Sequence, residues 1–272
     1  MPLAVCATPI GNLEDVTLRT LRELGEADLV LCEDTRRTRI LLDRHGVSAR
    51  LLSFHRHNEA QRTAELLPRL EAGERIALAS DAGLPGVNDP GARLLAAVLE
   101  RGVPVTVLPG PSAVETALVA SGLVGERYTF ISYLPRTRAG RDALWRELRG
   151  WDWPVVAFES PRRLPASLAG LAEAEPGRSV VVCRELTKRF EEVVRGSARE
   201  VAERFRDAPK GEVTLVIGPA AGPAAAERAG VPDEASEAVA ELVAAGLPRR
   251  RAARIVARVT GIPPNTLYRS SL

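Results

Sequence analysis

Residues 75–86 read RIALASDAGLPG, an apolar run followed at once by serine, aspartate, glycine and proline. Segments between such runs show helical periodicity, as at Leu66, Leu67 and Leu70. Strands that alternate with helices predict βαβ units and a mostly parallel sheet. The runs have few polar residues in their middles, as expected when helices cover both faces of the sheet. Four more apolar runs occupy the first 110 residues, at 3–8, 29–34, 51–54 and 104–110.

Loops rich in turn-forming and polar residues follow all five predicted strands. Because the carboxyl ends of parallel strands share one edge of the sheet, we expect these loops to meet in one cleft. There glycine lets the backbone approach a ligand, and proline keeps the loops rigid. Taken alone, Asp34 or Ser112 could cap a helix and Asp81 could be a turn residue, but five such loops in register favour a ligand site. The loops are TPIGN (8–12), EDTR (33–36), HRHNE (55–59), SDAGLPG (80–86) and PGPSA (109–113).

A second group of apolar runs follows, at 128–134, 154–160, 179–185, 191–196 and 212–218. Only residues 186–190 separate the third run from the fourth. That is too short for a crossover helix, so these two strands should pair antiparallel. The sequence therefore predicts an α/β protein with two α/β domains and a small helical C-terminal extension. We expect a first domain with a mostly parallel sheet over 1–116, a second with a mixed sheet over 117–220, and the extension over 234–272.

The C-terminal extension is basic. Residues 219–233 (PAAGPAAAERAGVPD) are typical of a linker, and helices are expected at 234–245 and 248–260, with a short turn at 264–269. Gly246 and Gly261 are plausible helix stops. Residues 234–272 contain six arginines and three glutamates, in a chain whose net charge is only +2.

Composition limits the class of protein. With 45% hydrophobic and 26% charged residues, the 272-residue chain is typical of soluble globular proteins, not of disordered or collagen-like ones. Three scattered cysteines, an N-terminus without a basic region and no long apolar run favour a cytoplasmic protein with no membrane span. Phosphate-binding glycine motifs, nucleophile elbows and zinc motifs are missing. His55 and His57 alone are a weak metal signal, so we expect no metal.

Several stretches, taken together, resemble one family. In order along the chain they are ATPIGNLEDVTLR (7–19), CEDTRRTRILL (32–42), HNE (57–59), SDAGLPGVNDPG (80–91), PGPSA (109–113), FESPRRL (158–164), CRELTKRFEE (183–192), KGEVTLVIG (210–218) and GIPPNTLYRSSL (261–272). This combination resembles the tetrapyrrole-methylase fold group, the class III methyltransferases that depend on S-adenosylmethionine. Within it, the chain is most similar to bacterial enzymes that 2′-O-methylate a cytidine of small-subunit (16S) ribosomal RNA. Leu84 and Gly86 depart from the expected fourth loop, which has threonine before the proline and a bulkier aliphatic residue after it.

The resemblance implies a cleft between the two α/β domains that holds S-adenosylmethionine in a folded pose. It also implies a homodimer, and an acceptor in the decoding region of 16S rRNA, either as free RNA or in the 30S ribosomal subunit. The implied cofactor contacts lie on the first, fourth and fifth loops and on the facing domain. They are Pro9, Ile10, Gly11, Asp81, Ala82, Gly83, Pro85, Gly110, Ser112, Ala113, Phe158, Glu159 and Glu212.

Methyl transfer to a ribose hydroxyl is an in-line displacement with a neutral leaving group, so alignment is the enzyme's main task. The hydroxyl is a weak nucleophile, so a base or a cation beside it would help. Lys188, Glu185 and Asp34 are the catalytic candidates, and Lys188 is one of only two lysines. A surface charge beside Glu191 is the simpler interpretation of Lys188, and catalysis by positioning alone also stays open.

Arginines on the loops and the extension could bind RNA phosphates. For the extension, a solvated helix face is the simpler interpretation. Two other functions stay open: a tetrapyrrole (precorrin-type) methyltransferase of the same fold, and a non-catalytic RNA-binding assembly factor with a retained pocket. The basic extension disfavours the first, and intact motifs at every strand end disfavour the second. The candidate RNA-binding residues are Arg36, Arg37, Arg136, Arg138, Arg249, Arg250 and Arg251.

Overall fold

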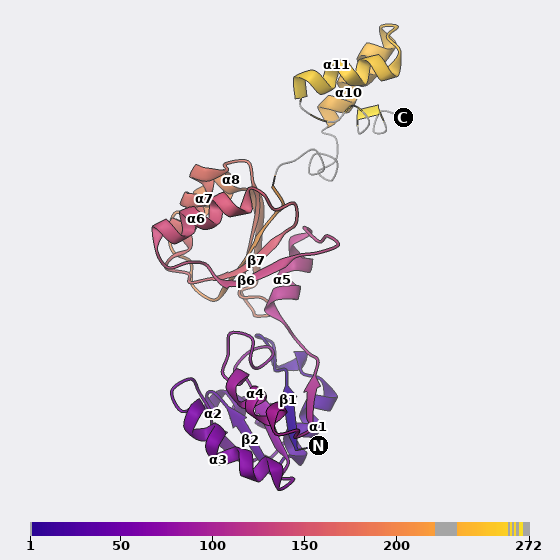
Figure 1. Cartoon of the computed structure of the whole chain (residues 1–272). Helices are drawn as coiled ribbons and strands as arrows, with labels where there is room; N and C mark the ends of the chain where they lie inside the picture. The colour runs from indigo at the N-terminus through magenta and orange to yellow at the C-terminus, as the bar shows by residue number, and fades with distance from the viewer. Residues whose placement is uncertain (1, 221–232, 261, 263, 265–266, 269–272) are drawn as a thin grey trace.

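The computed structural model describes residues 2–220, 233–260, 262, 264 and 267–268, and contains two five-stranded sheets flanked by helices (Figure 1). The first sheet has the order β3-β2-β4-β1-β5, and all its strand pairs are parallel, which confirms the βαβ prediction. Each strand ends one or two residues before its apolar run does. The strands are β1 (Leu3–Cys6), β2 (Leu29–Cys32), β3 (Leu51–Ser53), β4 (Ile76–Ala79) and β5 (Val105–Leu108).

Helices cover both faces of the first sheet because its strands are apolar on both sides. Val5 of β1 packs with Leu66 on one face, whereas its neighbour Cys6 packs with Leu24 on the other. All three cysteines are buried and free, as expected for core residues. The helical elements are η1 (Leu13–Asp15), α1 (Leu18–Glu26), α2 (Thr35–Arg44), α3 (Glu59–Glu71) and α4 (Ala92–Glu100).

The second sheet is mixed, with the order β6-β7-β10-β8-β9. β6 and β7 are parallel, and the other pairs are antiparallel, including the predicted pair β8–β9. Its strands are β6 (Thr129–Tyr133), β7 (Val155–Glu159), β8 (Ser179–Arg184), β9 (Glu192–Ser197) and β10 (Val213–Ile217).

Two layers of helices enclose the second sheet (Figure 1). Three of them, α6 (Arg138–Leu148), α7 (Leu164–Ala174) and α8 (Ala198–Arg204), bury Trp145 and Val201 against one face. The other face is covered by α5 (Ala113–Ser121), which packs on Val216. The expected boundary between 116 and 117 falls inside α5, so we propose that the two domains divide just before this helix.

The C-terminal extension forms the helices α10 (Asp233–Ala244) and α11 (Arg249–Thr260). They pack through a hydrophobic cluster of their own that includes Val239, Ala253 and Val256. Gly246 adopts a left-handed conformation (φ +92°) just after α10, as a helix stop requires. Residues 221–232 of the expected linker, Gly261 and half of the expected turn at 264–269 lie outside the described residues.

Candidate active site

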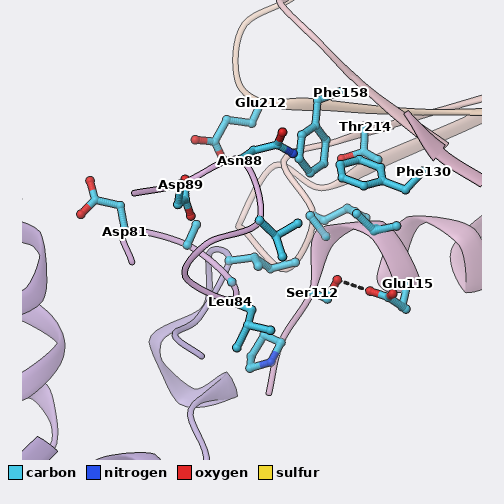
Figure 2. Close-up of a pocket in the computed structure, with 18 of the residues that line it drawn as sticks. Asp81, Leu84, Asn88, Asp89, Ser112, Glu115, Phe130, Phe158, Glu212 and Thr214 are labelled. Atoms are coloured by element: carbon cyan, nitrogen blue, oxygen red, sulfur yellow. Dashed lines mark hydrogen bonds between the residues drawn. The ribbon is translucent and has the colours of Figure 1, made fainter. Parts of the chain in front are cut away.

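A cavity of about 860 Å³ lies between the two sheets (Figure 2). The loops after β1, β2, β4 and β5 line one side of it, and β6, β7 and β10 line the other. In Figure 2, Asp81, Asp89 and Glu212 lie toward one end, whereas Phe130 and Thr214 lie toward the other. Glu115 lies on the same side as Phe130 and Thr214, so carboxylates line the cavity toward both ends.

The loop after β3 does not reach this cavity, in contrast to the expectation that five loops would meet there. Instead it fixes the start of α4, the helix that follows the fourth loop. Glu59 Oε1 accepts hydrogen bonds from the backbone N–H groups of Gly91 at 2.9 Å and Arg93 at 3.2 Å. Asn58 secures the loop itself by accepting from His55 N and donating to Ser53 O. The HNE motif thus stabilises neighbouring backbone and does not line the cavity itself.

The first and fourth loops are joined by backbone hydrogen bonds. Thr8 N donates to Gly83 O at 2.9 Å, and Gly83 N donates back to Thr8 O at 3.0 Å. The Thr8 hydroxyl also donates to Ser80 O at 3.0 Å. Gly83 has φ +78°, a conformation that favours glycine. These bonds fix Ile10 and Asp81 on one continuous wall.

Residues 185–188 cross from the second domain to the first loop. Glu185 (φ +52°) and Thr187 (φ +63°) both hold left-handed backbone conformations that are unfavourable for such residues. The Thr187 hydroxyl accepts a hydrogen bond from Asn12 N at 2.9 Å. Backbone strain of this kind persists only where surrounding contacts determine it, and it is concentrated at functional sites. We call residues 185–188 the crossing loop.

Lys188 is held by two carboxylates. Its Nζ donates to Glu185 Oε1 at 2.9 Å and to Glu212 Oε2 at 2.8 Å, and Glu191 instead accepts from Thr187 N. Burial lowers the pKa of Lys188, but the bonds to Glu212 and Glu185 outweigh burial, so its pKa is raised. The pKa of Glu185 is lowered by the Glu212 N–H and by Lys188. Lys188 is therefore suited to stabilise an anion and unsuited to remove a proton.

Asp34 is the N-cap of α2. Its side chain accepts from Arg36 N at 2.9 Å and pairs with the Arg36 guanidinium at 2.7 Å. These bonds lower the pKa of Asp34 to about 2, which makes it a weak base. Asp34 N donates to Asp81 Oδ1 at 3.1 Å, and Arg37 pairs with Asp81 Oδ2 at 3.2 Å. The EDTR motif thus caps a helix and also anchors Asp81.

Asp89 is a cavity residue that sequence reasoning missed. Burial raises its pKa to about 6, with further contributions from Glu33 and Asp81. Its neighbour Asn88 (φ +65°) accepts a hydrogen bond from the hydroxyl of Ser132 on β6, so this loop also contacts the second domain. In the sequence, the signal for Asp89 is the VNDPG run after the fourth loop. This run has the composition of an ordinary turn, and only the fold shows that it contributes to the cavity.

Most of the implied cofactor contacts line the cavity. Pro9 and Gly11 instead line a smaller neighbouring cavity, and Pro85 lines neither. Glu159 is buried, and its carboxylate already binds Ser160 N at 2.6 Å, the Ser167 hydroxyl at 2.6 Å and Arg163 at 2.5 Å. Those lining the larger cavity are Ile10, Asp81, Ala82, Gly83, Gly110, Ser112, Ala113, Phe158, Glu159 and Glu212.

The candidate RNA-binding arginines lie in three places. Arg37 lines both cavities, and its neighbour Arg36 is exposed beside them on α2. Arg136 and Arg138 are exposed around the start of α6, where Arg138 pairs with Glu173 at 3.3 Å. The remaining three, Arg249, Arg250 and Arg251, begin α11, and the last two are exposed.

The described part of the chain contains neither a metal-binding cluster nor a membrane-spanning helix. No group of three histidine, cysteine, aspartate or glutamate side chains there could hold a metal ion. No described helix combines the length and apolar character needed to cross a bilayer.

A family model for the Tetrapyrrole (Corrin/Porphyrin) Methylases matches residues 2–202. These residues include the whole first sheet and strands β6 to β9 of the second, and they exclude β10 and the extension. The chain therefore belongs to the tetrapyrrole methylase family.

Within this family, its relatives include proteins named ribosomal RNA small subunit methyltransferase I. The protein from Mesorhizobium japonicum is 41% identical over 99% of this chain and 91% of its own length. The protein from Thermotoga maritima is 41% identical over 79% of this chain and 97% of its own length, so about a fifth of this chain has no counterpart in it.

A solved structure shares the fold at lower identity. It is a uroporphyrin-III C-methyltransferase from Thermus thermophilus complexed with S-adenyl homocysteine, and it is 21% identical to this chain. The likeness covers 79% of this chain and 96% of that one, with a TM-score of 0.56.

Proposed function

We propose that this chain transfers the methyl group of S-adenosylmethionine to the ribose 2′-hydroxyl of a cytidine in the decoding region of 16S rRNA. The observation that carries the proposal is the near-full-length likeness to ribosomal RNA small subunit methyltransferase I relatives. The cleft built from family motifs supports it, because Ile10, Asp81 and Gly110 all line that cleft.

The cleft fits S-adenosylmethionine in size and charge. A cavity of about 860 Å³ lies within the ordinary range for small-molecule sites. The cofactor carries a sulfonium and an ammonium group, and the carboxylates of Asp81, Asp89 and Glu212 offer the opposite charge. Phe130 and Phe158, whose ring centroids lie 5.0 Å apart, provide an apolar surface for the adenine. The fold neighbour complexed with S-adenyl homocysteine also supports this choice of cofactor.

Residues of this chain would position the acceptor hydroxyl, stabilise its developing negative charge and accept its proton. Lys188 lines the smaller cavity and is the candidate cation for the developing alkoxide, with Glu185 as its positioning residue. Asp34 is a positioning residue for Asp81. Asp89 is the candidate base, because a carboxyl group whose pKa is raised to about 6 accepts a proton readily near neutral pH.

The proposal includes the larger partners that the family resemblance implies. Arg36, Arg37, Arg136 and Arg138 would bind phosphates near the cleft, and the arginines of α11 would bind more distant ones. A homodimer and a cytoplasmic location, where ribosomal subunits are assembled, complete the proposal.

The experiment is transfer of tritium from labelled S-adenosylmethionine to 30S subunits from a strain that lacks this methylation, followed by nuclease mapping. Label on a cytidine 2′-oxygen in the decoding region is the expected result. Free 16S rRNA is assayed in parallel to identify the form of the substrate. Cofactor binding without RNA labelling would point to a different acceptor, and no cofactor binding would overturn the assignment.

A further inference from the structure

A second cavity, of about 180 Å³, adjoins the cofactor cleft. Ile10, Arg37 and Asp81 line both cavities, so these residues mark the place where the two cavities meet. The smaller one holds the volume of about six water molecules, enough for one small ring and too little for a second cofactor. Any group seated there lies next to the cleft, with Lys188 also at its edge.

The second cavity has an apolar part and a polar edge. Pro9, Leu13 and Ile40 form apolar walls, and Ile40 remains 59% exposed on α2 although it is a large aliphatic residue. An apolar side chain left open beside a cavity is suited to cover the face of a planar ring.

At the polar edge, Arg37 and Asp81 have hydrogen-bonding capacity that their contacts with the described part of the protein do not use. Arg37 donates one hydrogen bond, to Asp81, among the described residues, although a guanidinium has five N–H donors. Asp81 accepts one bond at each oxygen, and each oxygen can accept another. Cytosine presents an amine donor beside a ring nitrogen and a carbonyl that accept, so a carboxylate and an arginine complement its edge. Uracil would place a carbonyl against the carboxylate.

Resting on the proposed function, we propose that the second cavity receives the base of the acceptor cytidine, extruded from the RNA. Its ring lies against Ile40, its amine faces Asp81 and its carbonyl faces Arg37. The ribose then lies where the two cavities meet, with its 2′-hydroxyl toward the cofactor methyl on one side and toward Lys188 on the other. Extrusion of a nucleotide into a protein pocket is established for enzymes that do chemistry on a base, so a pocket of this size can hold an extruded base.

The first test fills the cavity from its exposed wall. Ile40→Trp should lower kcat/KM for unmethylated 30S subunits by roughly 10- to 100-fold, as loss of a base contact does. The Kd for S-adenosylmethionine, measured by calorimetry, should stay within about twofold, because Ile40 does not line the cleft. Ile40→Ala, which leaves the cavity open but removes most of the apolar contact with the ring, should lower kcat/KM less than Ile40→Trp does. The matched control is Leu99→Trp on α4, where Leu99 is 63% exposed and lines neither cavity.

The second test concerns base discrimination. The enzyme should methylate 30S subunits with cytidine at the target at least about tenfold faster than subunits with uridine there. Asp81→Asn should reduce this ratio, and a ratio within one variant is insensitive to any loss of cofactor affinity. Suppose that the wild-type enzyme labels 30S subunits. If Ile40→Trp then has unchanged kcat/KM, or if Asp81→Asn keeps the wild-type ratio of cytidine to uridine methylation, this inference alone is overturned. A wild-type enzyme that binds cofactor but never labels 30S overturns the proposed function, and the inference with it.

Discussion

The position of Asp89 in the cleft changes the pKa of its carboxyl group. Its neighbours include two carboxylates, Glu33 and Asp81, and the cation Arg56, and burial is the largest influence on it. If Asp89 is the base, activity should rise with pH as the group ionises, with a midpoint near its pKa of about 6. Asp89→Asn should then lower kcat by roughly 10²- to 10⁴-fold, beyond any loss of cofactor affinity that removal of its charge causes. An unchanged pH–rate profile in this variant would exclude the role.

The same residue predicts a change in stability of definite sign. The pKa of Asp89 rises from 3.8 in the unfolded chain to about 6 in the folded one, so ionisation destabilises the fold. This destabilisation is absent below 3.8 and complete above about 6. Asp89→Asn should therefore raise the melting temperature increasingly from about pH 4 to about pH 6, with no further gain above that. Thermal denaturation across this pH range measures the effect, and destabilisation at about pH 7 would contradict it.

Gly11 is the point where the crossing loop meets the first loop. A Cβ atom there would lie 2.5 Å from Lys188 Cγ and 2.9 Å from the backbone oxygen of Leu186. The lysine could rotate away, but the backbone oxygen could not. Gly11→Ala should therefore displace the crossing loop, lower stability by about 1–3 kcal/mol and weaken cofactor binding.

Chemical denaturation and calorimetry with S-adenosylmethionine measure the two effects of Gly11→Ala. The control is Gly177→Ala, where a Cβ meets nothing within 4 Å. Equal behaviour of the two variants would mean that the crossing loop does not depend on close approach at Gly11.

At the scale of the element, substitutions of Asp34 at the start of α2 distinguish a helix-capping role of this residue from a catalytic one. Asp34 caps this helix through Arg36 N, and asparagine caps as well as aspartate does. Asp34→Asn should thus keep the melting temperature and most of kcat, whereas Asp34→Ala should lower the melting temperature by roughly 2–4 °C. Thermal scans and initial rates on both variants decide the matter. A loss of kcat in the asparagine variant of 100-fold or more, roughly, would restore Asp34 as a base.

At the scale of the whole molecule, the extension is a separate packing unit. Its helices share a hydrophobic cluster with one another, and the family model ends at residue 202. Arg250, Arg251 and Arg254 are exposed on α11, so changing all three to glutamine should leave the fold and cofactor binding intact. Affinity for 30S subunits should fall, and the slope of log K against log salt should decrease by roughly two to three. A variant with unchanged salt dependence would leave α11 as a solvated helix face.

The sequence by itself determined the strands, the mostly parallel first sheet, the antiparallel pair β8–β9 and the family. Apolar runs and short connections are local patterns, and the 186–190 connection permits only an antiparallel pair. It also identified four loops of the cleft, because parallel strands bring their carboxyl ends to one edge, but it wrongly included the loop after β3.

Only the tertiary structure decided what each loop residue does. Ile10 lines the cofactor cleft, whereas its neighbours Pro9 and Gly11 line the second cavity alone. Lys188 acquires its charge partner Glu212 from a strand connection 24 residues away, and Asp89 acquires its raised pKa from burial. Side-chain direction, burial and distant charges depend on how the two sheets face each other, and no local pattern encodes that arrangement.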